Sequence, residues 1–146
     1  VLISEEGNYL YPDLVITCEK PKFQDDAFDT LLNPQVVMEI LSESTEKYDR
    51  GRKFASYRAL ESLHTYVMIS QNEPRVEMFC RQPDGAWLMS VMDGMDAEWH
   101  LPQPEVRIKL SDLYVVINVA DKVDLKFQRT HVTAVLPKGT IKTLGA

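Results

Sequence analysis

The feature that most constrains the fold of this 146-residue chain is a short apolar run with a carboxylate near its centre, Val36-Val37-Met38-Glu39-Ile40-Leu41. A continuous apolar run of this length is typical of a β-strand buried on both faces of a sheet. Side chains alternate along a strand, so Glu39 should share one face with Val37 and Leu41. A buried carboxylate is unfavourable unless a cation or hydrogen-bond donors meet it. The run therefore predicts a central strand whose one face meets something polar.

The patterns around this run predict a mixed β-sheet with helical cover. Strands are expected at Val1–Ser4, within Tyr9–Cys18 (regular from about Leu14), and at His64–Ser70, Arg75–Arg81, Ala86–Met92 and Val106–Leu110. One long helix is expected over Glu46–Ser62 and a short one from Ser111 to Tyr114, while the polar Glu19–Pro34 should be a loop. This order favours an α/β (α+β) fold with a mixed sheet over a regular βαβ array.

Length and composition indicate one ordinary globular domain with no membrane span. Hydrophobic residues make up 45% and charged residues 26% of the chain, and no apolar run approaches the roughly 20 residues that cross a bilayer. Cys18 and Cys80 form no C-x-x-C pair, so we expect two buried free thiols in a reducing, cytoplasmic compartment. His64, His100 and His131 have no spacing that implies a metal ligand.

The ends of the chain carry weaker information. The chain opens without Met on a predicted strand, so we expect part of the N-terminal sequence to lie outside it. We assign residues 1–119 to the domain. The tail at 120–146 has weak periodicity, and it could be an extra strand pair, a disordered end or sequence foreign to the domain.

Three residues could form one site. Asp13 begins the strand at Leu14, and if that strand neighbours the one with Glu39, the two carboxylates converge. A divalent metal relieves the repulsion between close carboxylates. Lys53 lies on the helix that follows the strand of Glu39 and shares a helix face with Asp49 and Tyr57 at intervals of four. This helix could fold Lys53 back over the acids.

Each of these residues also has a purely structural interpretation. Asp13 could only cap a turn after Pro12, and Glu39 could be a buried acid paired with an arginine. Lys53 could simply pair with Asp49 on a solvated helix face, and a tyrosine such as Tyr57 more often belongs to a core. Spacing alone leaves both interpretations open.

The order and spacing of several segments resemble the Uma-two family of putative restriction endonucleases, which belongs to the PD-(D/E)XK nuclease superfamily. The resemblance covers about Val1 to Val116. It is carried by Tyr11–Val15, Val37–Thr45, Asp49–Tyr57, His64–Ser70, Arg75–Arg81 and Ser111–Tyr114. It implies a restriction-endonuclease-like fold with a mixed central sheet and flanking helices.

The resemblance also implies roles for individual residues. Asp13 and Glu39 would be the metal-binding acids, and the backbone carbonyl of Ile40 would be a further ligand for Mg²⁺ or Mn²⁺. Leu41 stands where the superfamily's E-x-K motif has its lysine, and Lys53 from the following helix would replace that lysine. The acidic, helical N-terminal segment usual in the family has no match here.

The predicted function is therefore metal-dependent hydrolysis of phosphodiester bonds in DNA. The alternatives are an inactive nuclease-fold module for binding or oligomerisation, and a hydrolase for another phosphate ester. A net charge of −6 argues against a protein that coats DNA. DNA could meet the loop Glu19–Pro34 and a helix carrying Lys47, Arg50, Arg52, Lys53 and Arg58. Because nucleases that cut both strands often pair, we expect a homodimer and no membrane partner.

Overall fold

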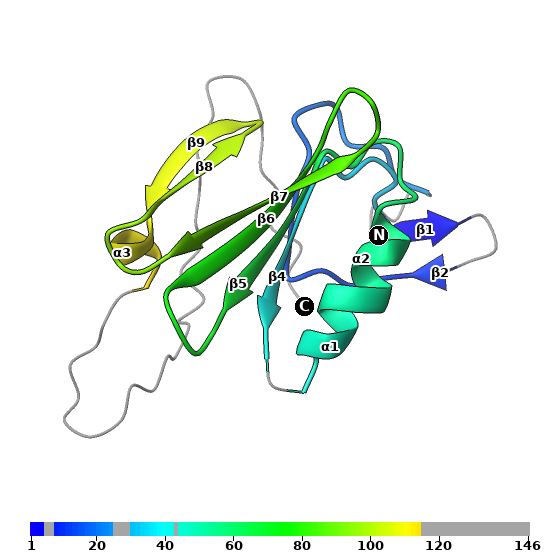
Figure 1. Ribbon diagram of the computed structural model, residues 1–146. Coiled ribbons are helices and arrows are strands. Elements are labelled where there is room, and N and C mark those ends of the chain that lie inside the picture. Colours follow the sequence, from blue (N-terminus) through cyan, green and yellow to red (C-terminus); the bar gives the residue numbers. More distant parts are fainter. Residues whose placement is uncertain (5–7, 25–29, 43, 115–146) are drawn as a thin grey trace.

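The computed structural model describes residues 1–4, 8–24, 30–42 and 44–114. In chain order, the described part contains β1 (Leu2–Ser4), β2 (Asn8–Tyr9), β3 (Leu14–Ile16), β4 (Val36–Leu41), α1 (Glu46–Tyr48), a π-helical segment (Asp49–Lys53), α2 (Phe54–Tyr57), β5 (Thr65–Ser70), β6 (Arg75–Arg81), β7 (Trp87–Asp93), β8 (Glu98–Pro102), β9 (Glu105–Lys109) and α3 (Leu110–Leu113). Figure 1 shows the helices and the two hairpins placed around one twisted sheet.

The central sheet has five strands in the order β3-β4-β5-β6-β7. Only β4 and β5 run parallel, and the other neighbours are antiparallel. This confirms the mixed sheet that the sequence predicts. The parallel pair needs a crossover connection, and the helical stretch between Glu46 and Tyr57 provides it. β4 lies between β3 and β5, which explains why the apolar run around Glu39 is buried.

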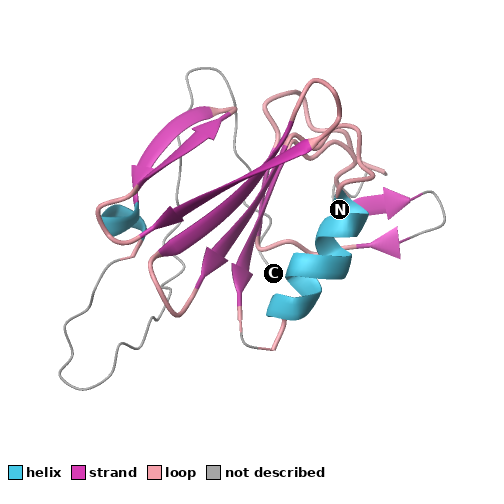
Figure 2. Cartoon of the chain, viewed as in Figure 1, coloured by secondary structure: helices cyan, strands magenta, loops and turns pink. Residues whose placement is uncertain are grey.

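The two faces of β4 belong to different halves of the core, as the alternation predicts. Val37 and Leu41 pack with Phe54, Tyr57, Leu63, Tyr66 and Met68 beneath the helices. Val36 and Met38 face the opposite side, which is covered by the β8–β9 hairpin and α3 through Trp99, Leu101 and Leu110. Figure 2 shows the helical stretch between Glu46 and Tyr57 and this hairpin on opposite sides of the strands. Glu39 therefore lies on the face that the helices cover.

Several boundaries differ from the predictions. The helix expected over Glu46–Ser62 ends at Tyr57 and is interrupted by the π-helical segment Asp49–Lys53. β8 was not predicted, although Glu98-Trp99-His100-Leu101 alternates between exposed and more buried side chains. Cys18 is exposed and Cys80 is half-buried, so the expectation of two buried thiols was wrong.

Other predictions meet the described residues only in part. Apart from one bridge between Phe23 and Leu31, the described residues of Glu19–Pro34 form neither helix nor strand. The tail at 120–146 lies outside the described residues. Within the ranges that the structure describes, no helix is long and apolar enough to cross a membrane.

A buried acid on β6 fastens the helical stretch to the sheet. Glu77 is 3% exposed. Its carboxylate accepts hydrogen bonds from both Nη1 and Nη2 of Arg50, and the distance from Nη2 to Oε1 is 3.0 Å. Arg75 Nε donates to the same Glu77 oxygen at 3.0 Å, and Arg50 Nε also bonds Glu46 at 2.7 Å. Burial raises the pKa of Glu77, but the two arginines outweigh it and hold that pKa below its ordinary value. Arg50 thus fixes the segment that carries Lys53.

Replacing Glu77 by Gln should lower the free energy of unfolding by about 2 kcal/mol at neutral pH, because Arg50 and Arg75 lose the buried carboxylate that they share. Both arginine side chains are about one-third exposed, so solvent screening keeps this loss of stability below that of a fully buried ion pair. Since the folded pKa of Glu77 is depressed, its contribution is present above the unfolded pKa and disappears as the pH falls through the folded value. Urea unfolding at several pH values measures this.

The matched control is Glu98→Gln, which removes the same charge from an exposed ion pair with Arg107. It should change the free energy of unfolding by less than about 0.5 kcal/mol. Equal losses for the two variants would contradict the role given to Glu77.

Candidate active site

Neighbouring strands bring the two predicted acids together. β3 pairs with β4 so that Leu14 faces Met38 and Val15 faces Val37. Extending this antiparallel register by one residue places Asp13 opposite Glu39. The Asp13 carboxylate also accepts a hydrogen bond from the backbone N–H of Ile40, with Oδ2 at 2.7 Å. Asp13 is therefore fixed against the main chain beside Glu39, and does more than cap a turn after Pro12.

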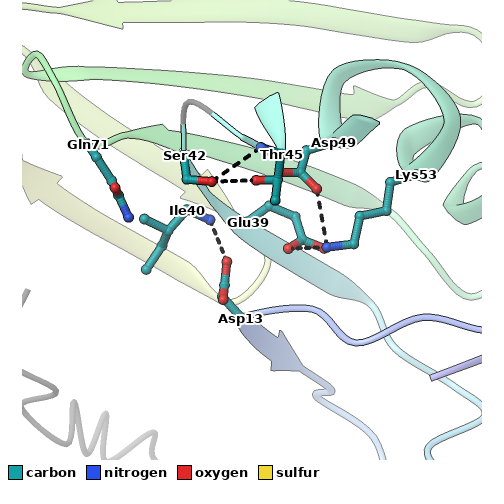
Figure 3. Close-up of a pocket in the computed structure, with 8 residues that line it drawn as sticks. All are labelled: Asp13, Glu39, Ile40, Ser42, Thr45, Asp49, Lys53 and Gln71. Carbon is teal, nitrogen blue, oxygen red and sulfur yellow. Dashed lines mark hydrogen bonds and ion pairs between the residues drawn. The ribbon is translucent and has the colours of Figure 1, made fainter. Parts of the chain in front are cut away.

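The helical stretch brings Lys53 over the same point. Its Nζ lies 2.7 Å from Glu39 Oε2 and 3.3 Å from Asp49 Oδ1. Figure 3 shows the ammonium group between these two carboxylates, with Asp13 approaching from another side. Lys53 does pair with Asp49 at i,i+4, but inside the protein rather than on a solvated face, since the two side chains are 12% and 3% exposed. The partner of Glu39 is this lysine and not an arginine.

These residues line a cavity of about 310 Å³, which we call the acidic cavity. Its walls are Asp13, Glu39, Ile40, Ser42, Thr45, Asp49, Lys53 and Gln71. Gln71 was missed by the sequence reasoning. It follows β5, whose last residue pairs with Leu41 in the parallel register, so a prediction of parallel pairing would have located it. Ser42 and Thr45 are hydrogen-bonded to each other at 2.9 Å.

Two buried carboxylates in the cavity are only partly satisfied. Glu39 and Asp49 are 1% and 2% exposed. Among the described residues, none donates a well-aligned hydrogen bond to Glu39 Oε1, and Asp49 Oδ1 has only the Lys53 ammonium, at 3.3 Å. An orphaned buried acceptor is strongly unfavourable. With three acids and one lysine in one cavity, negative charge is only partly balanced.

The titration of the buried groups reflects this imbalance. Burial raises the pKa of Glu39 to about 7, and the negative charges of Asp13 and Asp49 oppose the attraction of Lys53. Burial lowers the pKa of Lys53, but Glu39 and Asp49 outweigh burial and the net shift is upward. The Tyr57 hydroxyl is also buried, and burial together with the nearby Glu39 raises its pKa. Tyr57 is thus a core residue that borders the site.

The oxygen-rich cavity suits a hard divalent cation. Glu39 Oε1 is available, Asp13 lies opposite, and Ile40 lines the same cavity. Carboxylate and carbonyl oxygens are the ligands that Mg²⁺ prefers, with water completing its shell. Among the described residues no group of three or more His, Cys, Asp and Glu side chains is arranged to hold a metal ion. A cation here would therefore rely on two acids, the Ile40 carbonyl and water.

Of the basic residues expected to face DNA, Arg50 is already engaged. Its guanidinium is held by Glu46 and Glu77. The Arg58 guanidinium lies over the Phe54 ring at 5.4 Å from its centroid. Lys47, Arg52 and Arg58 are exposed, whereas Lys53 points into the acidic cavity.

A family model described as "Putative restriction endonuclease", Uma2, matches residues 1–111. The chain belongs to the Uma2 family. The match includes every residue of the acidic cavity. It confirms the resemblance stated from the sequence.

Two curated relatives come from Synechocystis sp. The uncharacterized protein sll1609 is 36% identical over 96 residues, which cover 66% of this chain and 54% of the relative. The uncharacterized protein slr1290 is 37% identical over 89 residues, covering 61% and 46% of the two chains. The Uma2 chain described here thus spans about half the length of the curated relatives it matches.

Among solved structures, part of the chain is similar to a crystal structure titled as a putative nuclease belonging to DUF820 from Anabaena variabilis. The two are 20% identical with a TM-score of 0.46, over 57% of this chain and 45% of that one.

The raised pKa of Glu39 predicts a pH-dependent effect of Glu39→Gln on stability. An acid whose folded pKa lies above its unfolded value stabilises the fold below the unfolded pKa, and loses that contribution as the pH rises through the folded value. Without divalent metal, at about pH 8, the variant should exceed the wild type in free energy of unfolding by about 1–2 kcal/mol.

The difference should shrink towards about pH 5, where Glu39 is protonated and resembles glutamine. Urea titrations in a chelator, at both pH values, measure it. A variant that is less stable than the wild type at the higher pH would show that the Lys53 pair more than compensates for burial.

Proposed function

We propose that this chain supplies the catalytic centre for metal-dependent hydrolysis of phosphodiester bonds in DNA. The observation that carries the proposal is the buried Glu39 oxygen without a hydrogen-bond donor, beside Asp13 and under Lys53 in one open cavity. Membership of the Uma2 family supports nuclease chemistry. A lysine placed between buried acids is a costly arrangement for a protein that only needs to fold.

Each residue of the proposed site has a distinct role. Asp13, Glu39 and the Ile40 carbonyl would hold Mg²⁺ or Mn²⁺. When bound, such an ion lowers the pKa of a coordinated water and offsets charge on the scissile phosphate. Lys53 would orient the attacking water or neutralise the charge that develops on a phosphoryl oxygen.

The exposed basic residues of the helical stretch suggest where DNA would approach. Lys47 on α1 and Arg52 on the π-helical segment are exposed on the helical stretch that includes Lys53. Cationic side chains contact DNA phosphates regardless of base sequence. Arg50 is a poor candidate, because Glu46 and Glu77 already satisfy its guanidinium. We therefore assign phosphate contact to Lys47 and Arg52.

Calorimetric titration with Mg²⁺ and Mn²⁺ tests the metal site. The wild type should bind, and Glu39→Gln and Asp13→Asn should each lose at least about tenfold in affinity, because each removes one of two charged ligands. Glu98→Gln removes an acid from the exposed Arg107 pair and should bind as the wild type does. A wild type that binds neither ion would favour the non-catalytic nuclease-fold module.

Cleavage of plasmid DNA in the presence of Mg²⁺ or Mn²⁺ tests the chemistry. Lys53→Met should reduce the rate by about 100-fold or more, since removing one group that stabilises transition-state charge has effects of this size. Its metal affinity should not fall, because methionine takes away a competing positive charge. A cleavage rate that does not change with Lys53→Met, or with a chelator present, would contradict the proposed mechanism.

A further inference from the structure

Lys53 has two acidic partners in the acidic cavity, and the proposed metal site uses one of them. The ammonium group lies 2.7 Å from Glu39 and 3.3 Å from Asp49. The inference developed here rests on the proposed function, in which Glu39 gives its carboxylate to a divalent cation. The question is then what holds Lys53 when Glu39 is occupied.

Asp49 is built into the cavity independently of Glu39. It lies in the π-helical segment that also carries Lys53, and its backbone carbonyl accepts a hydrogen bond from the buried Tyr66 hydroxyl at 3.0 Å. Its side chain is almost fully buried, and Lys53 is its cationic partner among the described residues. π-Helical turns are rare and occur frequently at functional sites. Asp49 is therefore a fixed, buried carboxylate that already holds Lys53, four residues later.

Charge alone would drive Lys53 away from a metal-loaded Glu39. A divalent cation repels an ammonium group a few ångströms away, and the lysine side chain is long and flexible enough to leave for water. A second carboxylate next to Lys53 offsets that repulsion. In Figure 3, Asp49 and Lys53 lie on one side of Glu39, whereas Asp13 lies on another, where a cation could share both metal-binding acids.

We propose that Asp49 is a positioning residue that retains Lys53 in the acidic cavity when Glu39 binds the metal ion. Without metal, the ammonium balances Glu39 and Asp49 together. With metal, Glu39 is neutralised by the ion and Lys53 stays paired with Asp49, from where its ammonium can act on the water or the phosphate. Asp49 touches neither the ion nor the reacting atoms in this arrangement.

Nuclear magnetic resonance of the lysine ammonium groups, with and without saturating Mg²⁺, tests this directly. The Lys53 signal is assigned by its absence in Lys53→Met. In the wild type, its ammonium protons should exchange slowly in both states, because a buried, paired ammonium is protected from water. In Asp49→Asn, protection should persist without Mg²⁺, through Glu39, and fall by on the order of tenfold with Mg²⁺.

The matched control is Glu46→Gln, which removes one acid from the same helical stretch but not a partner of Lys53. It should leave the protection of Lys53 unchanged in both states. Calorimetry confirms that each variant is saturated with Mg²⁺, so that weaker Mg²⁺ binding is not mistaken for weaker protection of the Lys53 ammonium protons.

Three outcomes would overturn the proposal. Protection in Asp49→Asn that survives Mg²⁺ would show that Asp49 is not needed. Protection lost even without Mg²⁺ would show that Asp49 only supports the fold around Lys53. A wild type that binds no Mg²⁺ would remove the proposed function and this inference together, whereas the first two outcomes leave the proposed function intact.

Discussion

The burial of the Glu39 carboxylate is the constraint on which the arrangement of the site depends. Glu39 lies in β4, an interior strand of the sheet, where an isolated carboxylate would be strongly unfavourable. Its neighbours on that face are apolar apart from the groups of the acidic cavity. Lys53 must therefore approach from the helical layer, and this fixes where the stretch between Glu46 and Tyr57 can lie. A single buried charge links the strand, the crossover and the cavity.

The same face of the sheet holds a second charged anchor. In the strand register, Glu39 faces Met68 and Met68 faces Glu77, so the two buried acids lie on one row with an apolar residue between them. Arg50 meets Glu77 and Lys53 meets Glu39, three residues apart in the π-helical segment. The two acids differ in their hydrogen bonding. Both oxygens of Glu77 accept hydrogen bonds from arginines, whereas Glu39 Oε1 accepts none from the described residues. The Glu77 pair positions the helical stretch, and Glu39 belongs to the candidate site.

Local sequence patterns predicted much of the fold because burial and alternation act on a few residues at a time. The apolar run at Val36–Leu41 predicted the central strand and the face of Glu39 correctly, and the strands expected at Arg75–Arg81 and Ala86–Met92 correspond to the β6–β7 hairpin. The π-helical segment, and the end of the helical stretch at Tyr57, depend on tertiary contacts. One of these contacts is the ion pair between Arg50 and Glu77. β8 was missed because its residues are mixed polar and apolar. The burial of Trp99 depends on its packing against the core around Val36 and Met38, which only the folded chain shows.

The candidate site was predictable to a similar extent. The structure brings together Asp13, Glu39, Ile40 and Lys53, and their chemical roles stay proposals. Gln71 could not be found without the parallel register of β4 and β5. Asp49 was noticed only as a helical neighbour of Lys53, since its burial and its position in the acidic cavity are properties of the folded chain.

The proposed function requires the acidic cavity to be a divalent-metal site shared by Asp13 and Glu39. Anomalous diffraction from crystals of the protein soaked in Mn²⁺ would locate such an ion. We expect one strong peak in contact with the Asp13 and Glu39 carboxylates and the Ile40 carbonyl. Crystals whose cavity stays without a peak at saturating Mn²⁺, with Lys53 still on Glu39, would contradict it.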